Sequence, residues 1–236
     1  MDQTVTRQFR PATETILTLG ATLSMGMVDA DTYLNRGAVF VSAQTGNLVV
    51  FVVKLVQHGW GTAWVNVPVW IGYFLGCFGA QALSEFLGDG DHRKHMRWLM
   101  LLDAAAYLAL AYFQAILPTV FLIFLLGLMA GYDLTIFRQV GGIAINNGIM
   151  TGNTKSLAIS SYKGLINGDR NARKAQLNIL LVILTFIAGC ALGASVRQWG
   201  LSSLDALWLV TVLKVLLLLW LFVPAAMARP ASVTEK

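Results

Sequence analysis

Residues 40–51 read FVSAQTGNLVVF, and residues 145–159 read INNGIMTGNTKSLAI. Both stretches place Thr-Gly-Asn inside an otherwise apolar run, and the two sites lie more than a hundred residues apart. Glycine weakens a helix and lets another backbone approach closely, whereas Thr and Asn bring polar groups into an apolar setting. We therefore expect these two segments to be interrupted, and to be interrupted in the same way.

The composition assigns the chain to a membrane. Of its 236 residues 56% are hydrophobic and 12% are charged, and the mean hydropathy is +0.65. Soluble domains carry about 25% charged residues, so this chain has too few charges to cover a soluble surface. The net charge of +5 does not indicate nucleic-acid binding, because Lys and Arg lie between the apolar segments, where they orient a protein in the bilayer.

Eight segments are apolar and long enough, or nearly so, to cross a bilayer, which takes about 20 residues. They are residues 15–34, 38–57, 62–87, 98–117, 119–137, 142–162, 175–196 and 204–223. We treat residues 1–236 as a single membrane domain of the all-α class, since nothing between these segments resembles a soluble domain.

The two halves of the chain resemble each other. We place Asp29 on Asp133, the first Thr-Gly-Asn on the second, and Gly76-Cys77 on Gly189-Cys190, in the same order along the chain. The tripeptides themselves are Thr45-Gly46-Asn47 and Thr151-Gly152-Asn153. These matches predict an internal duplication, with repeat one at residues 14–117 and repeat two at residues 118–224. Such repeats are a common construction in membrane transporters.

Charge counting separates two topologies. If all eight segments cross, as two sets of four, nine Lys and Arg lie inside and six outside. If the Thr-Gly-Asn segments instead enter and leave on one side, each half has three crossings and the halves are inverted. Thirteen basic residues then lie inside, and only Arg36, Lys54 and Arg197 lie outside. The positive-inside rule favours this second topology, with short cytoplasmic tails at residues 1–13 and 225–236.

The spacing ahead of each tripeptide suits a re-entrant segment. Eight to ten residues lead from Ala38 to Thr45 and from Gly142 to Thr151. As helix they would reach about 12–15 Å, roughly half the hydrocarbon core. We expect Asn47 and Asn153 to act as N-caps of the half-helices that follow. The two helix N-termini would then direct their positive dipole ends at one central site.

One motif in the first half resembles a known family. Gly26, Asp29-Ala30, Phe40 and Thr45-Gly46-Asn47 follow the pattern of the YoaK-like family of bacterial integral membrane proteins, a domain-of-unknown-function family. In the second half this chain has Gly131-Tyr132-Asp133 where that family tends to carry a Gly-Gln-Asn-like sequence. The resemblance covers nearly the whole chain. It implies a polytopic inner-membrane protein and brings no established substrate or activity.

Ionisable residues inside a membrane are costly and commonly functional. Asp29 and Asp133 are predicted to lie at the two ends of a substrate pathway lined by both Thr-Gly-Asn tripeptides; the alternative is that each simply caps a helix turn. Asp103 and Lys214, in the fourth and last spans, are predicted to form a buried ion pair.

Small-xxx-small spacings at Gly72/Gly76, Gly127/Gly131 and Gly189/Gly193 indicate close helix packing, within the chain or in a homo-oligomer.

These features favour a secondary transporter or channel for a small polar solute or ion, in the bacterial inner membrane. The sequence contains no P-loop and no Gly-x-Ser-x-Gly. We therefore expect no enzyme activity, no cofactor and no metal site, and no partner other than lipid, solute and possible further copies of the chain. The alternatives are a non-transporting scaffold or assembly factor and, less favoured, an intramembrane enzyme.

Overall fold

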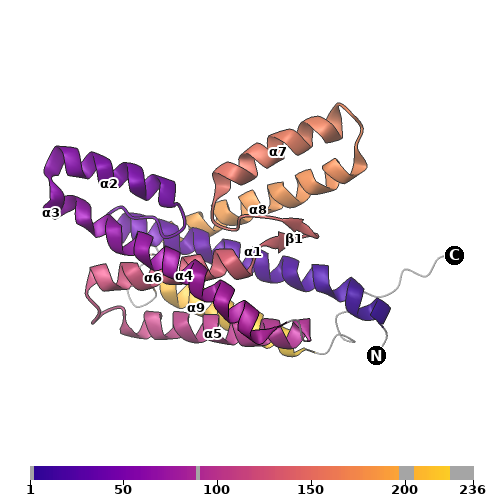
Figure 1. Ribbon diagram of the computed structural model, residues 1–236, viewed down its shortest axis with the longest axis horizontal. Coiled ribbons are helices and arrows are strands. Elements are labelled where there is room, and N and C mark those ends of the chain that lie inside the picture. Colours follow the sequence, from indigo (N-terminus) through magenta and orange to yellow (C-terminus); the bar gives the residue numbers. More distant parts are fainter. Residues whose placement is uncertain (1–2, 89–90, 197–204, 224–236) are drawn as a thin grey trace.

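The computed structural model describes residues 3–88, 91–196 and 205–223, and helices make up most of them (Figure 1). The long helices are α1 (Gln3–Asn35), α4 (Val67–Leu87), α5 (His92–Phe113), α6 (Thr119–Ile136), α8 (Arg170–Ser195) and α9 (Ala206–Phe222). Shorter elements are α2 (Gln44–His58), α3 (Trp60–Ala63), the 3-10 helix η1 (Trp64–Asn66), and α7 (Met150–Leu165). The all-α class expected from the sequence is confirmed, apart from one small β-hairpin.

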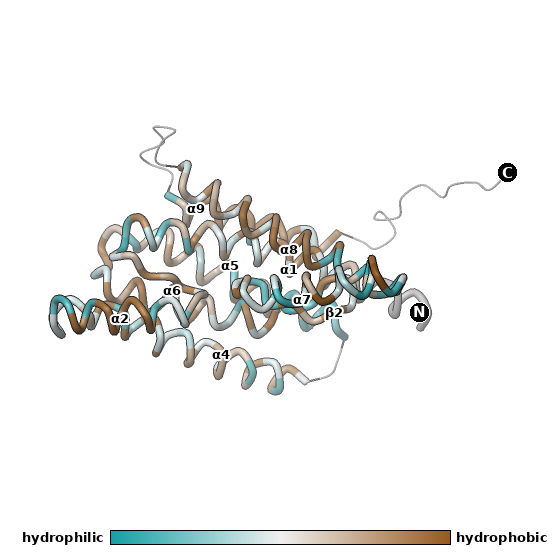
Figure 2. Tube along the Cα trace, turned by 90° about the horizontal axis from the view of Figure 1, so that it is seen from above, coloured by the Kyte–Doolittle hydropathy of each residue, from teal (hydrophilic) through white to brown (hydrophobic). Residues whose placement is uncertain are grey.

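The helix bundle has a largely apolar exterior, and several polar and charged side chains are buried within its apolar core. Among the described residues, four stretches are long and apolar enough to cross a membrane, namely Trp60–Leu87, His92–Phe113, Thr119–Ile136 and Arg170–Ser195, and α9 is apolar but shorter. Large side chains such as Phe74 and Phe78 on α4 are about two-thirds exposed, and hydrophobic colours run along most of α9 in Figure 2. Asp29 and Asp31 of α1 are buried. This distribution suits a protein whose exterior faces lipid and whose polar groups face one another.

The two halves interlock through their helices. The most extensive contacts join α4 to α6 and α1 to α8, so each pair takes one helix from each half. Gly26 of α1 lies against the backbone at Cys190 of α8, and Gly131 of α6 lies against the backbone at Cys77 of α4. A Cβ atom at either glycine would overlap the facing backbone. The predicted small-residue faces are therefore used for packing within the chain.

The chain ahead of each Thr-Gly-Asn is non-helical, whereas the reach of the re-entrant arms was worked out for a helix. Residues 36–43 form turns and extended chain, and residues 137–149 contain strands β1 (Gln139–Val140) and β2 (Ile143–Ala144). The strands pair antiparallel, with Val140 opposite Ile143. Gly141 and Gly142 between them have positive φ of 59° and 79°, which fits a two-residue hairpin turn. The prediction of helical arms ahead of the tripeptides is wrong.

Helices α2 and α7 begin at the tripeptides and point away from each other, α2 to the upper left and α7 to the upper right of Figure 1. They have 15 and 16 residues, so each extends about 23 Å at 1.5 Å per residue, which is short of a bilayer core of about 30 Å. The interrupted segments thus begin near the middle of the molecule and continue outward in opposite directions.

Two glycines on the same helix give a stability test of the interlocking. Gly76→Ala places a Cβ on the backbone carbonyl of Leu128, whereas Gly79→Ala meets nothing within 4 Å. We expect Gly76→Ala to lower the melting temperature of the purified protein, at a cost of about 1–3 kcal/mol, and Gly79→Ala to leave it unchanged or slightly raised. Equal melting temperatures for the two variants would contradict the α4–α6 contact.

Candidate functional site

Asn47 and Asn153 hold the chain ahead of their own helices. The backbone N–H of Phe40 donates to Asn47 Oδ1 at 2.9 Å, and Asn47 Nδ2 donates back to the Phe40 carbonyl. In the second half the N–H of Asn146 donates to Asn153 Oδ1 at 3.4 Å, and Asn153 Nδ2 donates to the Asn146 carbonyl at 2.6 Å. Both side chains therefore satisfy both polar groups of the residue seven positions earlier.

The predicted N-cap role of these asparagines is wrong. The caps are Ala43 for α2 and Ile149 for α7, and neither makes a side-chain cap hydrogen bond. Asn47 and Asn153 lie inside the first turn of their helices and are nearly fully buried. An asparagine amide offers one acceptor and two donors, so it can replace the ladder partners that the extended chain lacks. This role also fits the neighbouring glycine, because Gly46 packs against the Phe40 ring.

Asp29 supports the first interrupted segment from α1. Its Oδ1 accepts the backbone N–H groups of Val41 at 2.7 Å and of Ser42 at 3.1 Å, and its Oδ2 contacts the Ser42 hydroxyl. The same hydroxyl lies 3.0 Å from the carbonyl of Gly148 in the second interrupted segment. A hydroxyl carries one hydrogen, so Ser42 serves either Asp29 or Gly148 at any moment.

A cavity of about 340 Å³ lies where the two interrupted segments meet. Its lining comes from α1, α8, the chain that leads into α2 and α7, and the first residues of α7: Asp29, Ala30, Tyr33, Phe40, Ala43, Gly148, Met150, Thr151, Phe186 and Cys190. Of the predicted pathway residues, Asp29 and Thr151 line this cavity. Thr45, Gly46, Asn47, Gly152 and Asn153 are not part of the lining, and the two asparagines shape the cavity from behind it.

Asp133 lies elsewhere, in a second polar centre formed by α5, α6 and α9. Lys214 Nζ is 2.7 Å from Asp133 Oδ2 and also 2.7 Å from Asp103 Oδ2, and all three side chains are fully buried. The ammonium lies 5.2 Å from the ring centre of Tyr107 and 5.3 Å from that of Phe137. The structure thus brings Asp103 and Lys214 together, as the sequence suggested, and adds Asp133 as a third member.

A short piece of chain connects the two centres. Asn147 Nδ2 donates to the backbone carbonyl of Asp133 at 3.1 Å, and the next residue, Gly148, both lines the cavity and contacts Ser42. Sequence reasoning missed Ser42 and Asn147. The two consecutive asparagines in an apolar segment, Asn146-Asn147, were the available signal.

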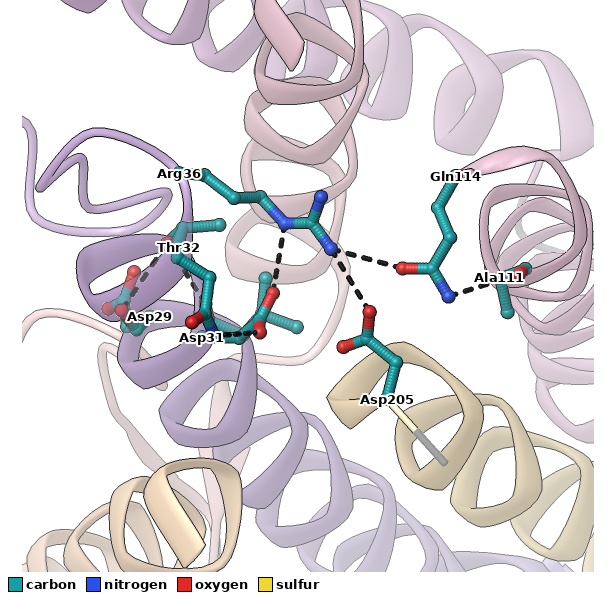
Figure 3. A network of polar contacts seen from close by, with 9 residues as sticks. Asp29, Asp31, Thr32, Arg36, Ala111, Gln114 and Asp205 are labelled. Atoms are coloured by element: carbon teal, nitrogen blue, oxygen red, sulfur yellow. Dashed lines mark hydrogen bonds and ion pairs between the residues drawn. The ribbon is translucent and has the colours of Figure 1, made fainter. Parts of the chain in front are cut away.

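A third polar group ties one end of the helix bundle together (Figure 3). Arg36, just after α1, pairs with Asp31 at 2.9 Å and with Asp205 ahead of α9 at 3.3 Å. The same guanidinium donates to Gln114 at the end of α5 at 3.0 Å. Three helices therefore share one arginine, which explains why Asp31 can be buried. Asp31 is five residues from Arg36, but Gln114 and Asp205 lie far along the chain, so their contacts with Arg36 could not be predicted from local sequence.

Comparison with known proteins assigns this chain to a family. The family described as "Protein of unknown function (DUF1275)" matches residues 17–220, which covers both interrupted segments and both polar centres. The chain belongs to the DUF1275 family. It is similar to "UPF0700 transmembrane protein YoaK" of Bacillus subtilis (strain 168), at 25% identity over 171 residues, 71% of this chain and 76% of that protein. No solved structure matches. Membership of the YoaK-like family is thus confirmed, as is the membrane assignment.

The buried charges of this DUF1275 protein can be tested by removing the shared ammonium. Lys214→Met leaves two buried carboxyl groups without their cation, so we expect a large loss of thermal stability, equivalent to about 3–5 kcal/mol. Lys155→Met, which removes an exposed lysine on α7, is the matched control and should be neutral. Thermal unfolding in one detergent measures both, and a Lys214→Met protein as stable as the control would contradict the cluster.

Proposed function

We propose that this DUF1275 protein is a secondary transporter or channel for a small polar solute or ion in the bacterial inner membrane. The observation that carries the proposal is the cavity at the meeting point of the two interrupted segments. Non-helical backbone within a membrane is tolerated where protein or water covers it, and in transporters such breaks surround the substrate site.

The proposed architecture is two inverted repeats, each with three transmembrane helices and one re-entrant Thr-Gly-Asn segment. Three observations support it: helices are exchanged between the halves as α1–α8 and α4–α6, both asparagines bind the residue seven positions back, and α2 and α7 point in opposite directions. The charge count then puts both termini in the cytoplasm. The expected tail at 225–236 and the first two residues lie outside the described residues.

Most of the cavity lining is apolar, and the two helix starts beside it favour an anionic or strongly dipolar solute. Ala43 immediately precedes α2, while Met150 and Thr151 open α7, so two helix N-termini adjoin the same space. Helix N-termini present unpaired N–H groups and the positive end of the helix dipole. The Asp29 carboxyl is already engaged by Val41 and Ser42, which limits its ability to repel an anion.

We favour a transport role over enzyme activity, and the main rival is a membrane scaffold or assembly factor. A scaffold needs no internal solute site, so that function does not account for the cavity beside the N-termini of α2 and α7. The two readings differ in ligand binding. A transporter is stabilised by its solute, because a ligand that binds the folded state raises its stability.

Ligand binding can be tested with a defined panel of small solutes: chloride, bicarbonate, phosphate, acetate, lactate, glycine, urea and glycerol. We expect at least one to raise the melting temperature of the wild-type protein and to cross the membrane of proteoliposomes that contain it. Thr151→Trp should abolish both effects, because Thr151 lines the cavity. Thr154→Trp, exposed on the same helix and absent from the lining, should preserve them.

No stabilisation and no flux with any member of this panel would count against the transport proposal. A stable partner that co-purifies with the protein under those conditions would support the scaffold instead. Effects that are the same in Thr151→Trp and Thr154→Trp would show that the solute binds elsewhere.

Topology can be tested with single cysteines in a Cys77→Ser, Cys190→Ser background. If α2 is re-entrant, His58→Cys at its end should react with a membrane-impermeant maleimide added outside spheroplasts. Ile166→Cys, exposed after α7, should react only when the cytoplasmic side is opened. Labelling of His58→Cys from the cytoplasmic side alone would favour the eight-crossing topology.

A further inference from the structure

The cluster at Lys214 has one acid more than it has bases. Asp103 and Asp133 each direct one carboxylate oxygen at the Lys214 ammonium at 2.7 Å, and all three side chains are fully buried. If both acids were ionised, the cluster would carry a net negative charge away from water. An isolated buried charge is very costly, and a group in that position neutralises instead. The excess charge therefore requires a bound cation or a proton.

Unpartnered polar atoms point to the same deficit. Among the described residues, the second oxygens of Asp103 and Asp133 have no hydrogen-bond donor, and neither does the Asn147 side-chain oxygen. The Tyr107 hydroxyl, fully buried within electrostatic reach of both carboxyls, is also without a partner. Several buried acceptors of this region thus lack a donor, and the Tyr107 hydroxyl lacks a partner. An unmade hydrogen bond at a buried group costs about 1–3 kcal/mol, so an additional donor at this place would be strongly stabilising.

A proton fits this site better than a metal ion. The ammonium of Lys214 already occupies the position between the two carboxylates and would repel a second cation. The described residues also offer no group of three or more His, Cys, Asp or Glu side chains that could hold a metal. Asp103 and Asp133 lie close enough to hydrogen-bond each other when one of them is protonated. A proton adds to one carboxylate oxygen, supplies the missing donor and brings the cluster to zero net charge.

The other ionisable groups around the cluster lie on three helices. Tyr107 is on α5, and Tyr132 on α6 donates its hydroxyl to the Leu99 carbonyl. Asp29 on α1 lies within electrostatic reach of Tyr107. None of these groups carries a positive charge, so they do not neutralise the second carboxylate of the cluster.

The cluster is connected to the cavity through the second interrupted segment. Asn147 contacts the backbone of Asp133, and the adjoining Gly148 lines the cavity and faces the Ser42 hydroxyl. A change in charge at Asp133 therefore acts on the chain that forms one wall of the cavity. Chain that both sites contact is one physical route by which two sites couple.

We propose that Asp103 and Asp133 share one proton beside Lys214, and that this proton is the coupling ion of the solute site. The coupling half of this inference rests on the proposed transport function, whereas the shared proton does not. Release of the proton leaves the cluster with one negative charge and removes the hydrogen bond between the two carboxyl groups. We expect the resulting rearrangement at Asp133 to shift the segment at Asn147 and Gly148, because Asn147 contacts the Asp133 backbone carbonyl. Solute binding and proton binding then influence each other reciprocally.

Infrared spectroscopy of the purified full-length protein tests the shared proton directly. A protonated carboxyl has its own carbonyl-stretch band, which we expect at neutral pH and expect to disappear as the pH rises. Asp103→Asn and Asp133→Asn should each lose this band, because the remaining acid forms a one-to-one pair with Lys214. Asp29→Asn should keep it, and so should the matched control Asp169→Asn, which changes an exposed helix cap.

Three results would overturn the assignment. The first is a band that persists in both Asp103→Asn and Asp133→Asn. The second is a band that disappears at fixed pH when sodium chloride replaces choline chloride, since a metal cation would then occupy the site. The third is absence of the band from Asp29→Asn protein at every pH at which that variant is folded, because the cluster is intact in this variant. This result does not depend on whether the Asp103 and Asp133 variants fold.

Alkylation of Cys190 tests the coupling. Cys190 lines the cavity and is the sole cysteine in Cys77→Ser protein. We expect its alkylation rate to change severalfold when Asp133→Asn is added at the same pH, because the wall at Gly148 shifts. Equal rates would overturn the coupling, while the infrared band reports separately on the proton. A solute panel without effect, together with a band lost in the two Asn variants, would mean a protonated cluster in a protein that is not a transporter.

Discussion

The hydrogen bonds from Asn47 and Asn153 to the backbone seven residues earlier are the interaction on which the rest of the structure depends. Within a bilayer every backbone N–H and C=O needs a partner inside the protein. Residues 36–43 and 137–149 leave the helix, so they lose the partners that a helix provides. Each asparagine replaces two of them, and Asp29 and the short β-hairpin replace others. The cavity forms where these replacement hydrogen bonds allow the chain to be non-helical.

The distribution of charge follows from the same constraint. The polar residues that α1 contributes are buried by other helices, while the outer surface carries large apolar side chains. Arg36 joins α1 to α9 and to the end of α5 at one end of the bundle, and Lys214 joins α9 to α5 and α6 deeper inside. The helix α9 is thus held by two cationic contacts, although almost all of its own residues are apolar. Buried ionic groups in a membrane protein are costly, which is the reason to look for function there.

Much of this arrangement could be predicted from the sequence. Apolar segment length predicted the helices, and the repeated Thr-Gly-Asn predicted two interruptions, which the structure has just ahead of the tripeptides and not at them. The pairing of Asp103 with Lys214 followed from the scarcity of charges in the last spans. Three features could not be predicted. The hydrogen bonds of Asn47 and Asn153 depend on chain that folds back, and the third carboxyl at Lys214 depends on which faces of α5 and α6 meet. The contacts of Arg36 with Gln114 and Asp205 join residues that are distant in sequence. Local periodicity carries no information on such contacts.

The exchange of helices between the halves has a consequence for biogenesis. Ribosomes deliver a chain from its N-terminus, yet α1 finds its main packing partner only in α8, which begins at Arg170. Until then the buried aspartates of α1 have no completed protein interior around them, and α4 waits in the same way for α6. Neither half can be a finished folding unit in the membrane. The structure therefore completes only late in synthesis, when α8 closes on α1 and α9 brings Lys214 to its two carboxylates, and a chain truncated before Arg170 would leave its first helix as a substrate for membrane quality control.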